Sequence, residues 1–212
     1  MKKLFLLICL GFSVTLLKAQ SPKYNSAMKD QIGKLDGAFQ AGNFPELANN
    51  FERIGNAEKS QWLPYYYAAY CQVMTALLEQ DKSRVDPIAD KADSLITKAE
   101  TIAGANSETN VIRSMIASAH MMVDPQQRWM QYGQASAGYI EKAKSQDSTN
   151  PRPVYLEGQA KFFTPEQFGG GKTVAAPVLE KALAMFDGFK PASDLHPVWG
   201  KSSTQYFLSQ CK

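Results

Sequence analysis

The chain has 212 residues, of which 44% are hydrophobic and 20% are charged, a balance typical of a folded globular protein and not of a disordered one. Alanine is frequent, with 25 residues against nine valines and nine isoleucines, which favours helices over strands. The formal net charge of +3 comes from three lysines within the first nineteen residues, and the rest of the chain holds 20 basic and 20 acidic side chains. The chain after residue 19 therefore carries no excess of positive charge of the kind that would indicate binding to nucleic acid or to an anionic membrane.

The N-terminal segment has the pattern of a secretory signal peptide. A short basic start, Met1-Lys2-Lys3, precedes an apolar stretch at 4–17, and Ala19 offers a small residue for cleavage before Gln20. The apolar stretch is shorter than the ~20 residues that a membrane-spanning helix needs. A buried core helix is the alternative, which the lysines at the extreme N-terminus disfavour.

Cys9 lies too early in this segment for lipid attachment and follows a bulky residue where a lipobox has a small one. We therefore expect a signal peptide at 1–19 and a single exported domain at 20–212, soluble and not lipidated. It would lie in the periplasm or outside the cell.

Four prolines recur at intervals of 42, 38 and 40 residues, and each precedes a stretch with helical periodicity. Three of them follow a residue of the type that caps helices. Proline suits the first turn of a helix, because its missing N–H has no partner there, and a preceding Asp or Thr accepts from the free amides. We therefore expect a helix to begin at each proline of this series: Pro45, Pro87 after Asp86, Pro125 after Asp124, and Pro165 after Thr164.

A second series of prolines, at positions 64, 153 and 197, alternates with the first. An aromatic residue follows each by two positions, a small residue by five and an apolar residue by nine, so the three share one helical face. The sets are Tyr66, Ala69 and Val73; Tyr155, Gly158 and Phe162; and Trp199, Ser202 and Tyr206. The small residue predicts a close approach of a neighbouring helix. Because Ala69 occupies the equivalent position, we expect Gly158→Ala to be tolerated.

The helices of the first series share small, large and small residues at i, i+4 and i+7, as in Ala175, Leu179 and Ala182. No segment alternates with period two between turn residues, so we expect no sheet. The fold class is therefore all-α. The spacing predicts four helix pairs and a C-terminal capping helix, at 23–57, 61–104, 107–147, 151–188 and 195–210.

Through these repeated motifs, the chain resembles the tetratricopeptide repeat (TPR) family over nearly all of its length after residue 19. It is also similar to a group of exported bacterial TPR-like proteins of unassigned function, through Asp124-Pro125, Asn150-Pro151-Arg152-Pro153 and the stretch from Phe168 to Lys172. The period near 40 exceeds the family's 34, which implies longer helices. The resemblance implies a right-handed solenoid of antiparallel helix hairpins with a concave binding face.

Motifs that would carry catalysis are incomplete. The run Gly169-Gly170-Gly171-Lys172 lacks the earlier glycine and the preceding strand of a phosphate-binding loop, and we interpret it as a flexible elbow between two helices. His120 and His196 are far apart in sequence, and no cluster of metal ligands accompanies either. Cys71 and Cys211 permit a disulfide, but two free thiols are the simpler interpretation.

The densest feature of the sequence is an aromatic run from Trp62 to Tyr70. Four tyrosines in six residues exceed what one packing stripe buries, so we select Tyr67, Tyr70 and Met74 as candidate ligand-binding residues on the concave face. The alternative is that these tyrosines fill contacts between the first and third helix pairs.

The function that these features predict is an exported TPR-like scaffold, which binds a protein or an extended peptide in the cell envelope. The alternative is a ligand-binding accessory of envelope uptake, for a glycan or another nutrient, and an enzyme acting on the envelope comes third without direct support. We expect a monomer without catalytic residues, cofactor, bound metal, nucleic-acid partner or membrane span.

Overall fold

The computed structural model describes residues 21–212, so the predicted signal peptide and Cys9 lie outside the described residues. Every regular element in this part of the chain is a helix, which confirms the all-α fold class. None of these helices has both the length and the apolar character needed to cross a membrane. The helices are α1 (Pro22–Ile32), α2 (Ala38–Ala41), α3 (Phe44–Ala57), α4 (Leu63–Leu78), α5 (Lys82–Ala103), α6 (Ser107–Val123), α7 (Pro125–Arg128), the π-helix η1 (Trp129–Gly133), α8 (Gln134–Gln146), α9 (Pro151–Phe163), the 3-10 helix η2 (Glu166–Phe168), α10 (Lys172–Gly188) and α11 (Lys201–Gln210).

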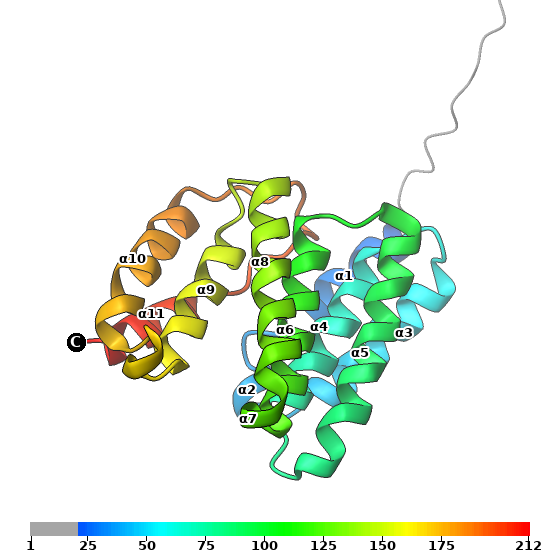
Figure 1. Ribbon diagram of the computed structural model, residues 1–212. Coiled ribbons are helices and arrows are strands. Elements are labelled where there is room, and N and C mark those ends of the chain that lie inside the picture. The colour runs from blue at the N-terminus through cyan, green and yellow to red at the C-terminus, as the bar shows by residue number, and fades with distance from the viewer. Residues whose placement is uncertain (1–20) are drawn as a thin grey trace, which may run out of the picture.

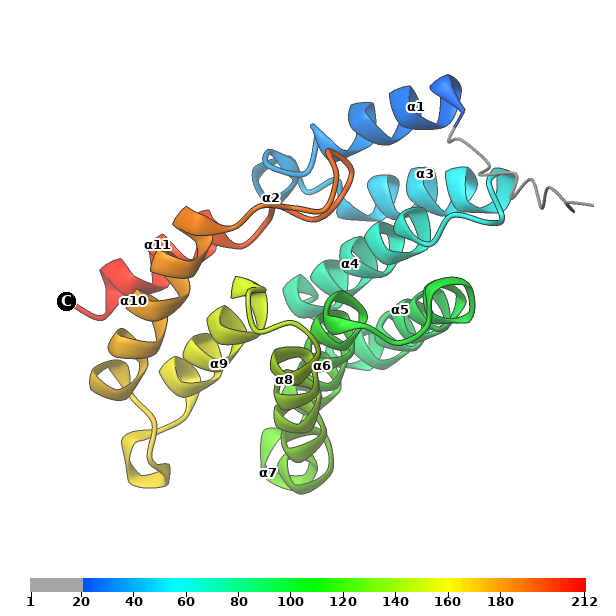
Figure 2. The same cartoon turned by 90° about the horizontal axis from the view of Figure 1, so that it is seen from above.

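Consecutive helices pack against one another along the chain (Figure 1). Helix α4 packs on α3 and α5, α6 packs on α5 and α8, and α9 packs on α8 and α10. Seen from above, α9 to α11 form one side of the molecule, α1, α3, α4 and α5 form the other, and α2, α6 and α8 lie between them (Figure 2). The helix boundaries agree with the predicted pairs to within a few residues, except that α11 begins at Lys201.

The proline series predicts the helix starts only in part. Pro45 and Pro125 lie in the first turns of α3 and α7, and the Asp124 side chain accepts from the Gln127 amide as a cap. Pro87 instead lies inside α5, whose cap is Asp81. Pro165 precedes η2, seven residues before the first residue of α10. Inside a helix, proline loses one hydrogen bond and its ring crowds the carbonyl four residues earlier, but α5 continues through Pro87. A proline alone therefore does not define the start of a helix.

The core centres on α4, which is buried along most of its length. Its tyrosines fill the space between α3 and the segment that joins α10 to α11: Tyr67 stacks on Phe51 with ring centroids 5.0 Å apart, and Tyr70 stacks on Trp199 at 4.6 Å. Aromatic side chains supply large buried area per residue, which explains why this central helix is so rich in tyrosine.

The shared face of the second proline series holds in α4 and α9 but not at the C-terminal helix. Tyr66, Ala69 and Val73 are fully buried. In α11, which begins only after Trp199, Ser202 and Tyr206 are exposed. The prediction assumes a helix that includes Pro197, but α11 starts four residues after it. The later positions of the series therefore do not share one helical face with Trp199.

Gly158 does lie at a close helix contact, as the series predicts. A Cβ at this position would lie 2.7 Å from Leu179 Cδ2 and 2.8 Å from Leu179 Cγ of α10. Leu179 is fully buried, so it has little room to withdraw. This contact favours the opposite of the expectation drawn from Ala69, because a methyl group at this position would overlap with Leu179 unless that side chain shifted.

Candidate functional site

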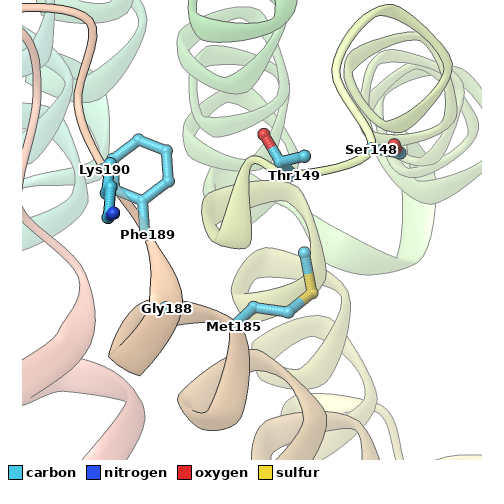
Figure 3. A pocket seen from close by; sticks show the side chains of 6 residues that line it. All are labelled: Ser148, Thr149, Met185, Gly188, Phe189 and Lys190. Carbon is cyan, nitrogen blue, oxygen red and sulfur yellow. The ribbon is translucent and has the colours of Figure 1, made fainter.

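A hollow of ≈ 430 Å³ opens where the end of α10 faces the loop between α8 and α9 (Figure 3). Ser148 and Thr149 line it from the α8–α9 loop. Met185 and Gly188 lie in the last turns of α10, and Phe189 and Lys190 follow that helix directly. The residues thus come from two segments about forty positions apart, which the packing of α9 on α10 brings together.

Local hydrogen bonds fix the α8–α9 side of the hollow. Asp147 Oδ1 accepts from the Thr149 amide at 2.9 Å and from the Thr149 hydroxyl at 2.6 Å. Asn150 then caps α9 by accepting from the Arg152 amide at 3.0 Å. A short polar turn between two helices, with an Asp and an Asn at the positions that cap, holds the two hydroxyl-bearing residues in place.

The lining combines two apolar side chains with one cation. Phe189 and Met185 are half-buried, so each presents part of an apolar surface to the hollow. Lys190 is exposed, and no acidic side chain among the described residues forms an ion pair with it. An aromatic ring and a thioether beside an ammonium group without an acidic partner suit an apolar ligand that carries an anionic group.

Neither histidine lines the hollow. The Nδ1 atom of His120 lies 2.7 Å from Asp86 Oδ1, and the ring stacks on Tyr132 with centroids 4.9 Å apart. His196 pairs through Nδ1 with the Ser193 hydroxyl at 2.7 Å, and burial together with the nearby Arg152 lowers the pKa of its ring. Within residues 21–212, no three His, Cys, Asp or Glu side chains gather as they would around a metal ion.

The predicted site residues lie elsewhere. Tyr67 is 1% exposed, and its hydroxyl donates to the Leu195 carbonyl at 2.9 Å. Tyr70 is buried under Trp199, and Met74 is partly buried against the same core. A ligand would reach these tyrosines only by displacing Leu195 and Trp199, so we do not include them in the candidate site, and their role in binding stays a prediction.

The glycine run and the two cysteines have structural roles and do not line the hollow. In the glycine run, Gly169 and Gly171 have φ of 81° and 97°, which lets the chain turn tightly between η2 and α10. The Gly170 and Gly171 amides donate to the carbonyls of Pro165 and Lys161, so they are not directed at a ligand. Cys71 and Cys211 are free thiols, and burial raises the pKa of Cys71.

Sequence reasoning missed the hollow and the buried polar cluster beside it. In that cluster the Arg152 guanidinium lies 3.1 Å from Glu108 Oε1, and Glu108 Oε2 accepts from the Tyr66 hydroxyl at 3.0 Å. Burial raises the pKa of Glu108, although Arg152 opposes this by favouring the charged carboxylate. The only signal in the sequence was the stretch from Asn150 to Pro153, which appeared as part of a resemblance and not as a site.

No family model matches the chain, and no curated protein matches its sequence. Among solved structures, the chain is similar to the HusA haemophore from Porphyromonas gingivalis. The two share 34% sequence identity with a TM-score of 0.80, and the match covers 92% of this chain and 95% of the other. Because this identity extends over nearly the whole of both chains, the chain belongs to the family of the HusA haemophore.

Proposed function

We propose that this protein binds haem or a related porphyrin outside the cytoplasm and serves nutrient uptake. The proposal follows the ligand-binding alternative from the sequence and not the scaffold interpretation. Its main support is the similarity to a haemophore over 92% of the chain at 34% identity.

The hollow has features that suit such a ligand. Haem is a flat apolar macrocycle with two carboxylates at one edge, and pockets for small ligands measure about 300–1,000 Å³. Phe189 and Met185 offer apolar surface for the macrocycle, while Lys190 offers a cation for a carboxylate. The thioether of Met185 is of a type that ligates haem iron in other proteins, so it is the candidate among the lining residues for an iron contact.

We also propose an arrangement, a location and an oligomeric state for the chain. The helix pairs form a right-handed TPR-like solenoid, and the chain is a single exported, non-lipidated domain that acts as a monomer. It binds its ligand without catalysing a reaction. A protein partner, which the TPR resemblance implies, would take over the ligand after capture.

Titration of the purified protein with haemin, followed in the Soret region, tests the proposal. We expect saturable binding of wild type, and about tenfold weaker binding for Phe189→Ala and for Lys190→Ala, because each removes a contact of more than about 1 kcal/mol. Met185→Ala is the third variant, and a change in its Soret maximum would identify the thioether as an iron contact.

Matched controls are Phe39→Ala and Lys142→Ala, which alter exposed side chains that do not line the hollow. Absence of saturable haemin binding would exclude the function. If the control variants weaken haemin binding as much as Phe189→Ala and Lys190→Ala do, the hollow is excluded as the binding site.

A further inference from the structure

Arg152, in the first turn of α9, is buried completely, which is unusual for an arginine. Its Nη1 donates to Glu108 Oε1 at 3.1 Å and to Asn150 Oδ1 at 3.0 Å, and its Nη2 donates to the Pro197 carbonyl. A fully buried charge is tolerated only where partners compensate it. Glu108 supplies the opposite charge, and of the guanidinium nitrogens only Nε is without a hydrogen-bond partner among the described residues. The guanidinium thus joins α6, α9 and a loop from a distant part of the chain.

That loop, residues 189–200, connects α10 to α11 and is called the α10–α11 loop below. Figure 2 shows it leaving α10, reaching toward α1 and α2, and returning to α11. Arg152 contacts both of its ends: the guanidinium carbon lies 4.8 Å from the centroid of the Phe189 ring and 5.5 Å from that of the Trp199 ring. Contacts of a cation with aromatic rings are strengthened where water is excluded.

The same loop is held from the other side by α4. Trp199 Nε1 donates to the Tyr66 hydroxyl at 2.9 Å, and Tyr66 in turn donates to Glu108. The Tyr67 hydroxyl binds the Leu195 carbonyl. The middle and the far end of the loop are therefore fixed by the core, whereas Phe189 at its near end also lines the hollow.

We infer that Arg152 is a positioning residue for the ligand hollow: it holds Phe189 and the α10–α11 loop in the conformation that receives the ligand. This inference rests on the proposed function, because it concerns the same hollow. Arg152 does not line the hollow, so it acts through the ring of Phe189. A side of the hollow that is already ordered in the free protein binds a ligand more tightly than one that becomes ordered only on binding. In the first case the entropic cost of ordering does not reduce the binding free energy.

A double-mutant cycle between Arg152→Met and Phe189→Ala tests this, with haemin as the probe. We expect Arg152→Met to weaken haemin binding about fivefold to tenfold, the range that corresponds to loss of one well-placed aromatic contact. In the Phe189→Ala background, the same change is expected to have a much smaller effect, because the ring through which Arg152 mainly acts is gone. Additive effects, or an unchanged affinity of Arg152→Met alone, would overturn the inference.

Hydrogen exchange of the ligand-free protein gives a second readout. Residues 189–200 are expected to exchange faster in Arg152→Met than in wild type, while the core of α5 is unchanged. The matched control is Arg113→Met, because Arg113 is also largely buried and also forms ion pairs, in its case with Asp93 and Glu100, but it does not contact the loop. It should leave both haemin affinity and loop exchange as in wild type.

If Arg152→Met does not fold, because it leaves the Glu108 charge buried without its partner, the cycle is repeated in a Glu108→Gln background, which removes that charge.

The outcomes of the binding experiments distinguish the proposed function from the inference about Arg152. Absence of saturable haemin binding by wild type overturns the proposed function and this inference with it. Wild-type binding that Phe189→Ala weakens but Arg152→Met does not overturns the inference alone.

Discussion

At the scale of single residues, Gly158 shows how a helix can require the absence of a side chain. Glycine within a helix is about 1 kcal/mol less favourable than alanine, yet a Cβ here would lie within 2.8 Å of two atoms of Leu179. The close approach of α9 and α10 that results also brings the end of α10 to the hollow.

We expect Gly158→Ala to lower the free energy of unfolding by about 1 kcal/mol, because overpacking of about 1–3 kcal/mol exceeds the gain in helix propensity. Gly138 in α8 is the matched control, since no atom lies within 4 Å of a Cβ built there. Gly138→Ala should raise the free energy of unfolding by about 0.5–1 kcal/mol. Urea denaturation measures both, and a Gly158→Ala variant as stable as wild type would show that Leu179 moves away at no cost.

At the scale of elements, α6 begins with a capping box. The Asn106 side chain accepts from the Thr109 amide at 3.1 Å, and the Thr109 hydroxyl accepts from the Asn106 amide at 3.0 Å. Two amides at the start of the helix are thereby paired. By contrast, Asn43 before α3 makes no capping hydrogen bond, and its Oδ1 is buried without a partner.

Asn106→Ala is expected to lower the free energy of unfolding by about 1 kcal/mol, and by no more than about 2 kcal/mol. Asn43→Ala should change it by less than about 0.5 kcal/mol, because no hydrogen bond of that side chain is lost. Chemical denaturation of both variants compares the same substitution at two helix starts. Equal destabilisation would mean that the side-chain hydrogen bonds of Asn106 contribute nothing.

The helices follow from the sequence more directly than the candidate hollow does, for one physical reason. Helix boundaries follow from the spacing of apolar residues, prolines and caps, which are local properties of the chain. The hollow depends instead on Phe189 and Lys190, which lie in a segment without periodicity, and on the contacts that place it. The tyrosines of α4 are conspicuous in the sequence because they are core residues that hold this segment, whereas Arg152 stands out only as part of the stretch from Asn150 to Pro153.

At the scale of the whole molecule, the core contains several tyrosines whose pKa values burial raises. The pKa of Tyr155 rises to about 12 because burial outweighs a hydrogen bond with Ser203 that lowers it, and that of Tyr24 rises to about 12 through burial and the charge of Glu58. Burial also raises the pKa of Tyr66, Tyr67 and Tyr70. In the unfolded chain all of these would ionise near pH 10.

The protein is therefore expected to lose stability in alkali. Above pH 10 the unfolded state releases these protons while the folded state keeps them, so the free energy of unfolding falls as pH rises. Each such tyrosine contributes up to about 1.4 kcal/mol per pH unit until the pH reaches its folded-state pKa. Absorbance at 295 nm and circular dichroism should change together between pH 10 and 12. Tyrosines that all ionise near pH 10 while the helices persist would contradict this.

The α10–α11 loop has a further consequence, for the way in which the chain folds. A linear array of helix pairs has contacts between neighbours only, so it forms and melts piece by piece. Here the Tyr67–Leu195 and Tyr66–Trp199 hydrogen bonds join residues 128 and 133 positions apart. Contacts of such long range are entropically expensive to close, which slows folding. Once closed, they couple α4 to the segment that follows α10, so we expect both to be gained or lost in a single cooperative transition.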